Sequence, residues 1–387
     1  MPIPQGKQAF PREEYLRRLN IVKSKMSERG VDVLVVTEPS NITYLSGYTA
    51  LSAYVPQALI VSVSHEEPTF ILRRMDAPAA IHQCFFSRSQ IVAYSEALVG
   101  HSNPDGYDAI IDHLLDFGAK CVGLEDSHLS AQVVGKVRSR VSTARLEDCS
   151  GLVTWTRLIE SDLEINYMRE AAAIADAAVA RAAEVIRPGL READAAAEIL
   201  AALARGVDRT AGTMVPSINM CTSPRTGTGH ISWSDEHFHQ GSQINLELGG
   251  VRFGYSAGIM RTFTIGEPSD RLKRIHDAEV AGLEAALSVS KAGNTCHDVA
   301  RAFYSSINKL GFEKESRCGY AIGIDWLEPT ASLQLGDYTV LQPNMTFHLM
   351  LGNWVDEDFG YVISETVRVT ESAVEVLTKT PRLNFQI

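Results

Sequence analysis

Short apolar runs alternate with segments of helical periodicity along the first part of the chain. The runs are rich in valine and isoleucine and are bounded by polar or turn-forming residues, which predicts β-strands. Between the last two runs, residues 107–118 place apolar side chains at helical spacing and end at Gly118. Alternating strands and helices are typical of an α/β domain, and we assign residues 1–157 to it. The predicted strands are 32–37, 58–63, 68–73, 90–95 and 120–125.

Alanine-rich helices and antiparallel strands replace this pattern in the second part of the chain. Residues 160–189 predict one long helix that is acidic in its first turn, and a second helix is predicted at 191–206. The same order returns about a hundred residues later, with a Lys-Ala-Gly sequence at 291–293 in the place of Arg-Pro-Gly at 187–189. Two copies of this order indicate a duplicated α+β domain over residues 158–387. Its strands are predicted at 244–263, 345–351 and 361–370.

The composition indicates a globular protein and argues against a nucleic-acid partner. Of the 387 residues, 45% are hydrophobic and 21% are charged, and the formal net charge is −11 without a clustered basic stripe. The polar N-terminus lacks the apolar stretch of a secretory signal, and the apolar runs are too short to cross a bilayer. The six cysteines show no CxxC spacing. We therefore expect a cytoplasmic protein with reduced thiols and no membrane partner.

Glu247 is the first candidate for chemistry because it lies within an apolar predicted strand. Alternation along this strand places Glu247 on the same face as Asn245 and opposite to Leu246 and Leu248. Burying a carboxylate costs several kcal/mol unless the group is paired or protonated. Two interpretations follow. Glu247 forms a structural ion pair with an arginine such as Arg261, or it faces a planar cationic ligand that presents two N–H donors.

The loop that precedes this strand contributes a histidine and an arginine. His230 ends the glycine-rich sequence GTGH, whose backbone can approach a ligand closely. A histidine that titrates near neutrality can move protons, which typically contributes about 10²–10⁴-fold to a rate; the alternative is a histidine satisfied within its loop. Arg225 is a candidate for binding a substrate carboxylate, or else a solvated loop residue. His237 and His239 could join His230 in holding one ion, although loop histidines are more often solvated.

The order of these segments resembles the creatinase, prolidase and aminopeptidase P family. Residues 160–387 resemble its pita-bread domain, and DVLVVTEPSNITYLSGY at 32–48 resembles a signature of its N-terminal domain. The resemblance implies an α/β N-terminal domain of the creatinase type, followed by an α+β pita-bread domain with an antiparallel sheet and a pseudo-twofold repeat.

The metallopeptidases of this family hold two metal ions with two aspartates, one histidine and two glutamates. Hard divalent ions at short separation require such carboxylate ligands, and they generate the hydroxide nucleophile. At the corresponding positions this chain has Glu247, Gly258, Tyr320, Met350 and Ser364. Glycine, methionine, tyrosine and serine are absent or poor ligands for such ions. We therefore expect that the dinuclear site is lost and that the protein uses no metal or other cofactor.

Creatinase itself, a metal-free member of the family, offers a precedent for the remaining residues. The resemblance places its catalytic histidine at His230, whereas its two substrate-binding glutamates fall at Met260 and Met350, which argues against creatine as the substrate. Four segments resemble the ectoine hydrolases, a metal-free branch that opens a cyclic amidine. The resemblance implies hydrolysis of ectoine to N-acetyl-2,4-diaminobutyrate, with hydroxyectoine as a second candidate substrate. The four segments are 41–57, 222–239, 245–262 and 378–386.

Further residues complete the predicted site. Glu365 follows the fifth ligand position, and a second carboxylate near Glu247 would poise a base near neutrality, although strand alternation points it away. Tyr320 either donates a hydrogen bond to a developing charge or packs as an aromatic with a satisfied hydroxyl, and His348 on a later strand is a further candidate. Flat aromatic faces for a cation are offered by Trp233, Trp326, Tyr48 and Tyr54, which are otherwise core residues.

The prediction is thus a metal-independent amidine hydrolase. Its catalytic residues would be Glu247, His230 and Glu365, and its substrate-binding residues would be Arg225, Tyr320, Trp233, Tyr54 and His348. In creatinase a loop of the partner subunit closes the site, so the resemblance also implies a homodimer in which residues 49–57 have this role. Two alternatives remain: an Xaa-Pro metallopeptidase with an altered site, and a non-catalytic protein that binds a small solute.

Overall fold

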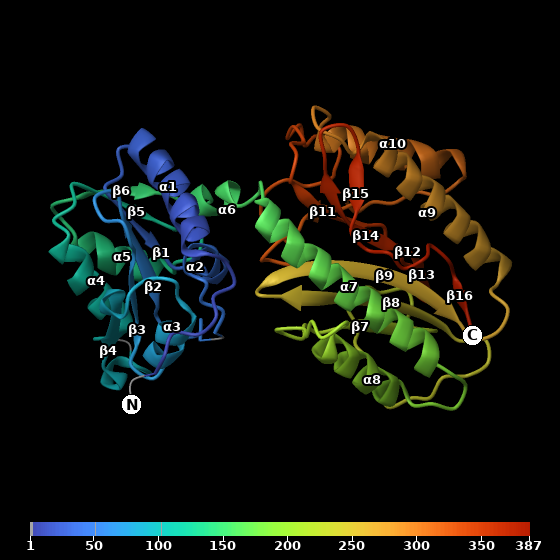
Figure 1. Cartoon of the computed structure of the whole chain (residues 1–387). Coiled ribbons are helices and arrows are strands. Elements are labelled where there is room, and N and C mark those ends of the chain that lie inside the picture. Colours follow the sequence, from blue (N-terminus) through green and yellow to red (C-terminus); the bar gives the residue numbers. More distant parts are fainter. Residues whose placement is uncertain (1–2, 51, 102) are drawn as a thin grey trace. The chain divides into compact units, whose positions relative to one another are not determined.

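The computed structural model describes residues 3–50, 52–101 and 103–387. The chain divides into two compact units, Met1–Arg157 and Leu158–Ile387, and Figure 1 shows the course of the chain through each. No helix in the described part of the chain is long and apolar enough to cross a membrane.

The first unit is built on a six-stranded sheet with the order β4-β3-β2-β1-β5-β6. Strand β1 pairs in antiparallel register with β2 and in parallel register with β5, so the sheet is mixed. Helices α4 and α5 pack with alternate residues of β1, Val33 and Val35, on one face. The strands predicted from the apolar runs are confirmed. The strands are β1 (Val33–Val36), β2 (Ala58–Ser62), β3 (Thr69–Arg73), β4 (Ile91–Tyr94), β5 (Cys121–Leu124) and β6 (Arg145–Asp148), and the helices are α1 (Arg12–Glu28), α2 (Pro39–Ser46), α3 (Ala77–Gln83), α4 (Gly106–Asp116), α5 (Ala131–Arg140) and α6 (Leu152–Thr156).

Helix α1 is the longest element of this unit that the apolar pattern did not predict. Its buried face contains Arg18, which pairs with Glu14 at 2.9 Å and lies 4.2 Å from the centre of the Phe10 ring. Because a buried arginine interrupts the apolar stripe, the helix lacks the regular pattern by which amphipathic helices are recognised.

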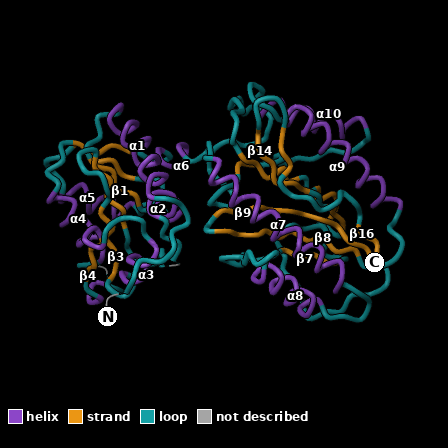
Figure 2. Tube along the Cα trace, in the orientation of Figure 1, coloured by secondary structure: helices purple, strands orange, loops and turns teal. Residues whose placement is uncertain are grey.

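The second unit contains two helix pairs, each associated with a four-stranded sheet, as Figures 1 and 2 show. Helices α7 and α10 begin with capping boxes, Ser161 with Glu164 and Thr295 with Asp298, which satisfy N–H groups of the first turn. The sheets have the orders β16-β9-β8-β7 and β10-β11-β14-β15. This is the predicted α+β pita-bread domain with its internal repeat. The helices are α7 (Asp162–Val185), α8 (Glu192–Arg205), α9 (Asp270–Val289) and α10 (Cys296–Lys309), and the strands are β7 (Asn219–Thr222), β8 (Gln243–Arg252), β9 (Tyr255–Thr264), β10 (Tyr320–Ala321), β11 (Thr346–Met350), β12 (Asn353–Asp356), β13 (Phe359–Tyr361), β14 (Ser364–Val369), β15 (Val374–Val376) and β16 (Phe385–Gln386).

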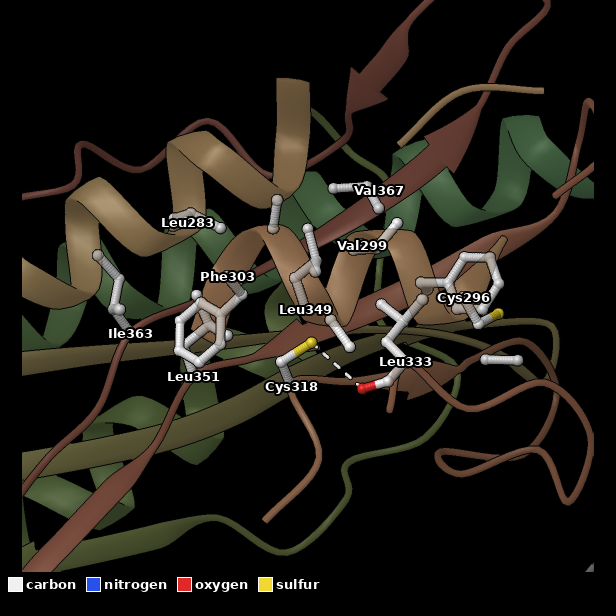
Figure 3. Packing of buried hydrophobic residues seen from close by; sticks show 14 of the residues in the cluster. Leu283, Cys296, Val299, Phe303, Cys318, Leu333, Leu349, Leu351, Ile363 and Val367 are labelled. Carbon is white, nitrogen blue, oxygen red and sulfur yellow. Dashed lines mark hydrogen bonds between the residues drawn. The ribbon is translucent and has the colours of Figure 1, made fainter. Parts of the chain in front are cut away.

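Each helix pair buries one face of its sheet. Figure 3 shows side chains of α9 and α10, among them Leu283 and Phe303, packed against Leu349 of β11 and Val367 of β14. On the other sheet, Leu246 and Leu248 of β8 pack with residues of α7 and α8, as strand alternation predicted. The opposite face of β8, which carries Glu247, is therefore left to form a site.

Candidate active site

A cavity of about 270 Å³ lies beside the middle of strand β8. One of its lining residues, Glu247, is acidic, and another, Trp326, offers a large aromatic surface. A cavity of this size suits a small organic molecule, and its mixed lining suits a ligand that is both flat and charged. The lining residues are Pro216, Ser217, Asn219, Glu247 and Trp326.

Glu247 is held by a neighbouring strand and by its own burial. Asn219 stands opposite Glu247 in the register of β7 and β8, and its Nδ2 donates to Oε2 of the carboxylate at 2.8 Å. Burial raises the pKa of Glu247, against the lowering effects of this hydrogen bond and of the positive charge of His230. The result is a carboxylate of increased basicity at the wall of a cavity, which is the property that a general base or a cation-binding group needs.

Two glycines on the hairpin of β8 and β9 make room for the indole ring of Trp326. Gly249 and Gly258 face each other in the register. A Cβ added at Gly258 would lie 2.8 Å from the Trp326 ring and 3.0 Å from the His348 imidazole, and one added at Gly249 would also overlap the Trp326 ring. A side chain at position 258 would require the Trp326 ring to move. The Trp326 ring therefore fills the space beside Gly258 and forms an aromatic wall.

A buried hydrogen-bond network lies next to this wall. His348 on β11 lies between Tyr320 of β10, whose hydroxyl is 3.1 Å from Nδ1, and Ser364 of β14, whose Oγ is 2.7 Å from Nε2. Trp326 Nε1 donates to the same Tyr320 oxygen at 3.0 Å. Complete burial lowers the pKa of His348 to about 3, so its imidazole is neutral. Burial first, and then the charge of Glu247, raise the pKa of the Tyr320 hydroxyl.

The donors at this site do not fit a two-metal centre. Of the five positions that the resemblance associates with metal ligands, only position 247 carries a carboxylate. The two ring nitrogens of His348 are occupied by hydrogen bonds with Tyr320 and Ser364. Among the described residues, no three His, Cys, Asp or Glu side chains form a group that could hold a metal ion. We therefore derive no step through a metal.

The His230 loop is shaped by glycines that pack against the hairpin of β12 and β13. A Cβ at Gly229 would lie 2.5 Å from the Trp354 ring, and one at Gly227 would overlap backbone oxygens of residues 356 and 357. Thr226 Oγ1 donates to the carbonyl oxygen of Asp358 at 2.9 Å. The exposed His230 at the end of this loop is close enough to Glu247 for its charge to lower the pKa of the carboxylate. The structure thus brings these two predicted residues together.

Arg225 is bound within the protein through one nitrogen of its guanidinium. Its Nη2 pairs with the buried Glu192 of helix α8 at 2.6 Å and also contacts the Ser234 hydroxyl at 3.2 Å. Its Nε is buried without a hydrogen-bond partner among the described residues. The charge of Arg225 is paired with Glu192, and binding of a substrate carboxylate by Arg225 stays a prediction. Arg225 ties the His230 loop to the helix.

Glu365 is directed away from Glu247, which corrects its assignment as a catalytic residue. It forms a buried ion pair with Arg261 at 2.9 Å and accepts a hydrogen bond from Arg382 at 3.0 Å and another from Thr378. Because Arg261 pairs with Glu365, the structural interpretation of Glu247 as a partner of Arg261 is also wrong. This cluster fastens the C-terminal segment to strand β14.

None of the five predicted substrate-binding residues, Tyr320 and Arg225 included, is among the residues that line the cavity beside β8. His348 is fully buried in the network, so it supports other residues and offers no exposed atom to a substrate. Trp233 packs against the apolar cluster of α7 and α8. Tyr54 belongs to the first unit, is 76% exposed, and accepts a hydrogen bond from Arg73 at 2.7 Å. Its role across subunits stays a prediction, and Leu51 of the same loop lies outside the described residues.

The sequence pattern did not single out two residues near the site. Asn219 is the first residue of the short strand β7, and only its register opposite Glu247 reveals its role. Arg317 places its guanidinium 4.8 Å from the centre of the Tyr320 ring and lines a second cavity of about 420 Å³, whose lining also includes Glu313, Lys314 and Glu315. Within the described part of the chain, no carboxylate lies at ion-pair distance from Arg317. A cation without an internal counter-charge is suited to an anionic ligand.

Comparisons with known proteins agree with this architecture. Residues 166–371 match metallopeptidase family M24, and residues 18–159 match the creatinase/prolidase N-terminal domain. The chain is 60% identical over 385 residues to an uncharacterized hydrolase/peptidase of Sinorhizobium fredii, covering 99% of both chains. It is 36% identical over 392 residues to the ectoine hydrolase of Halomonas elongata, covering 97% of this chain and 98% of that one. The X-Pro aminopeptidase of Thermotoga maritima has the same fold, with a TM-score of 0.84 at 22% identity over 95% of this chain and 99% of that one.

Proposed function

The chain belongs to metallopeptidase family M24, and from this membership we propose that it is an ectoine hydrolase, which opens the cyclic amidine ring of ectoine to give N-acetyl-2,4-diaminobutyrate. The observation that carries the proposal is the position of Glu247. It is a carboxylate of raised pKa beside an aromatic wall, in a family site whose other metal-ligand positions hold no carboxylate. The similarity to the Halomonas elongata ectoine hydrolase supports this choice of substrate.

The two charges of ectoine have partners near the cavity. The protonated amidine is planar, carries two N–H groups, and suits the Glu247 carboxylate, which has one oxygen bound by Asn219. The face of Trp326 can stack on a flat cation, which typically contributes about 0.5–2 kcal/mol. Arg317 is our candidate for the ring carboxylate, since Arg225 is neutralised by Glu192.

Hydrolysis requires a new C–O bond at the amidine carbon and cleavage of one ring C–N bond. Glu247 either removes a proton from a water molecule that attacks this carbon, or attacks the carbon itself to form a covalent imidate ester that water then cleaves to the acetamide and the free carboxylate. In both routes the ring nitrogen that leaves takes up a proton, and the carbon becomes the carbonyl of an acetamide. His230 is the proposed carrier of that proton, because it is the titratable group whose charge acts on Glu247.

The side chains at the former metal-ligand positions do not favour an Xaa-Pro metallopeptidase. The peptidases of the family need the bridging carboxylates of two metal ions, and position 258 here cannot accept a side chain while Trp326 stands beside it. The metal-independence of the reaction is therefore part of the proposal.

The substitution Glu247→Gln tests the proposal. It keeps the shape of the side chain and removes its charge, so we expect kcat with ectoine to fall by at least about 10²-fold. Glu236→Gln is a matched control, because Glu236 is an exposed carboxylate in the loop that carries His230, and it should keep wild-type turnover. Wild-type turnover in Glu247→Gln would contradict the proposal. Saturable binding of ectoine without turnover by the wild-type protein would favour a binding protein instead.

A further inference from the structure

The hydrogen-bond network behind the cavity begins at a backbone N–H group. The amide of Met260 donates to Ser364 Oγ at 2.6 Å, and Ser364 is fully buried. An amide has one hydrogen, so Ser364 is the acceptor in this bond and must place its own hydroxyl proton elsewhere. Of the described atoms, the one within reach that can accept this proton is His348 Nε2, at 2.7 Å. Leaving a buried hydroxyl unpaired costs about 1–3 kcal/mol, which favours this arrangement.

These hydrogen-bond assignments determine the tautomer of His348. A neutral imidazole carries one proton, and since Nε2 accepts from Ser364, the proton is on Nδ1. The Nδ1–H group therefore donates to the hydroxyl oxygen of Tyr320, 3.1 Å away. The complete burial of His348 keeps the ring in this neutral form.

Tyr320 consequently receives two hydrogen bonds at one oxygen. The second comes from the indole N–H of Trp326 at 3.0 Å, and an indole nitrogen can only donate. Both acceptor positions of the hydroxyl are then used by groups of the protein. Among the described residues, these two nitrogens are the hydrogen-bond partners of the Tyr320 oxygen. Its own proton has no acceptor within this network.

From this geometry we infer that Tyr320 is held as an obligatory hydrogen-bond donor toward the cavity, and that His348 and Ser364 are positioning residues that fix the direction of its proton. Tyr320 is not itself among the residues that line the cavity, but its hydrogen-bond partner Trp326 lines it together with Glu247. The negative charge of Glu247 also acts on the Tyr320 hydroxyl, which places the two groups near each other.

The role of this fixed donor in the reaction rests on the proposed function, which identifies the ligand as ectoine. When the new oxygen bonds to the amidine carbon, the electron pair of the C=N bond moves to nitrogen, and loss of the hydroxyl proton to the base then leaves negative charge on the new oxygen. This oxygen forms the carbonyl as the ring C–N bond breaks and its electron pair leaves with the ring nitrogen, which takes up a proton. A donor already aimed at this oxygen stabilises it without reorientation, and it keeps its proton throughout the reaction. Two of the three residues that build this donor occupy former metal-ligand positions, 320 and 364. A hydrogen-bond donor thus stands where the related peptidases use positive charge.

The tautomer of His348 can be measured without any substrate. Nitrogen-15 NMR of protein labelled at its histidines distinguishes Nδ1–H from Nε2–H rings, and the His348 signal is the one that disappears in His348→Gln. We expect a neutral Nδ1–H ring that does not titrate between about pH 5 and 8. An Nε2–H ring, or one that titrates in this range, would overturn the inference.

Two variants extend the test to activity. Tyr320→Phe removes the donor and keeps the ring, so kcat should fall by about 10²-fold with little change in KM. Ser364→Ala leaves His348 Nε2 without its donor, so the ring can take the Nε2–H form and accept the Tyr320 proton. We expect that tautomer by NMR, together with a loss in kcat of about 10- to 100-fold.

These outcomes separate the inference from the function on which it rests. A Ser364→Ala protein with an unchanged tautomer and full activity would overturn the positioning role. A wild-type protein with the Nδ1–H ring that leaves ectoine intact would refute the proposed function, while the direction of the Tyr320 proton would stand.

Discussion

A carboxylate within a mostly apolar strand costs folding free energy, and Glu247 is such a group. Its position was predictable because the apolar run and the alternation of the strand together place one acid on the free face. Its partner Asn219 was not predictable, since it becomes adjacent only through the pairing of β7 with β8.

The free-energy cost of burying the Glu247 carboxylate leads to a prediction about the stability of the folded protein. Because burial raises the pKa of Glu247 above its usual value of 4.5, the folded state binds the proton more tightly than the unfolded state. The destabilisation from its ionisation therefore appears as the pH rises above about 4.5 and persists at higher pH. We expect Glu247→Gln to have a higher Tm than the wild type at neutral pH, and a difference that shrinks toward pH 4 in thermal melts. A lower Tm of the variant at neutral pH would contradict this.

Glu365 illustrates a residue whose role only the structure shows. Its partners Arg261 and Arg382 come from another strand and from the C-terminal segment, so spacing along the sequence gave no signal for them. Breaking a buried ion pair leaves an uncompensated charge, which typically costs about 3–5 kcal/mol. We expect Glu365→Ala to lose about this much in denaturant unfolding, while the folded enzyme keeps a kcat near that of the wild type. A stable variant without activity would instead make Glu365 catalytic.

Arg317 provides a test of how the substrate is oriented. If its guanidinium binds the ring carboxylate, Arg317→Ala removes a charged hydrogen bond, which typically contributes about 1.5–3 kcal/mol. We expect KM for ectoine to rise by about 10- to 100-fold with a smaller change in kcat. Arg317→Lys should recover part of the loss, because it restores the charge without the planar fork. An unchanged KM in steady-state kinetics would assign the carboxylate to another group.

At the scale of elements, local signals predicted the helices and strands that have regular patterns. Apolar periodicity marks α7 and α10, and apolar runs mark β1 to β5 of the first unit, whereas β6 has no such run and was not predicted. The hairpin of β12 and β13 escaped prediction because its strands are short, its turn at 357–358 is acidic and little of it alternates. This hairpin nevertheless shapes the loop of His230.

The packing of that loop against the hairpin gives a prediction at this scale. A Cβ at Gly227 would overlap backbone oxygens of residues 356 and 357, which cannot move as a side chain could. We expect Gly227→Ala to displace the loop and to lower kcat with ectoine by about 10²-fold, as misplacement of a catalytic group typically does. Gly241→Ala is a control, because that glycine also lies on the loop before β8 and a Cβ there meets nothing within 4 Å, although its φ of +87° makes some loss of stability expected. Full activity of Gly227→Ala would contradict the positioning of His230 by this contact.

At the scale of the whole molecule, the duplicated order of helices and strands was readable from the sequence, and the family resemblance of residues 160–387 implied the pita-bread domain. The structural change at the former metal site could not be read from the sequence. Replacement of a carboxylate by Gly258 can be read in the sequence, but the Trp326 ring that occupies the space comes from a loop about seventy residues later. The site is formed by segments that lie far apart in the sequence, and the spacing of residues along the chain does not show which of them will be in contact. The expected homodimer stays a prediction.

The most direct test of metal-free ectoine hydrolysis by this protein is NMR of ectoine incubated with the purified, chelator-treated protein, with the metal content of the same sample measured in parallel. We predict that the ring signals give way to those of N-acetyl-2,4-diaminobutyrate in the absence of bound divalent metal, and that Glu247→Gln leaves the ring intact. Unchanged ectoine with the chelated wild-type protein, together with cleavage of an Xaa-Pro dipeptide after divalent metal is added back, would contradict both the substrate and the chemistry proposed.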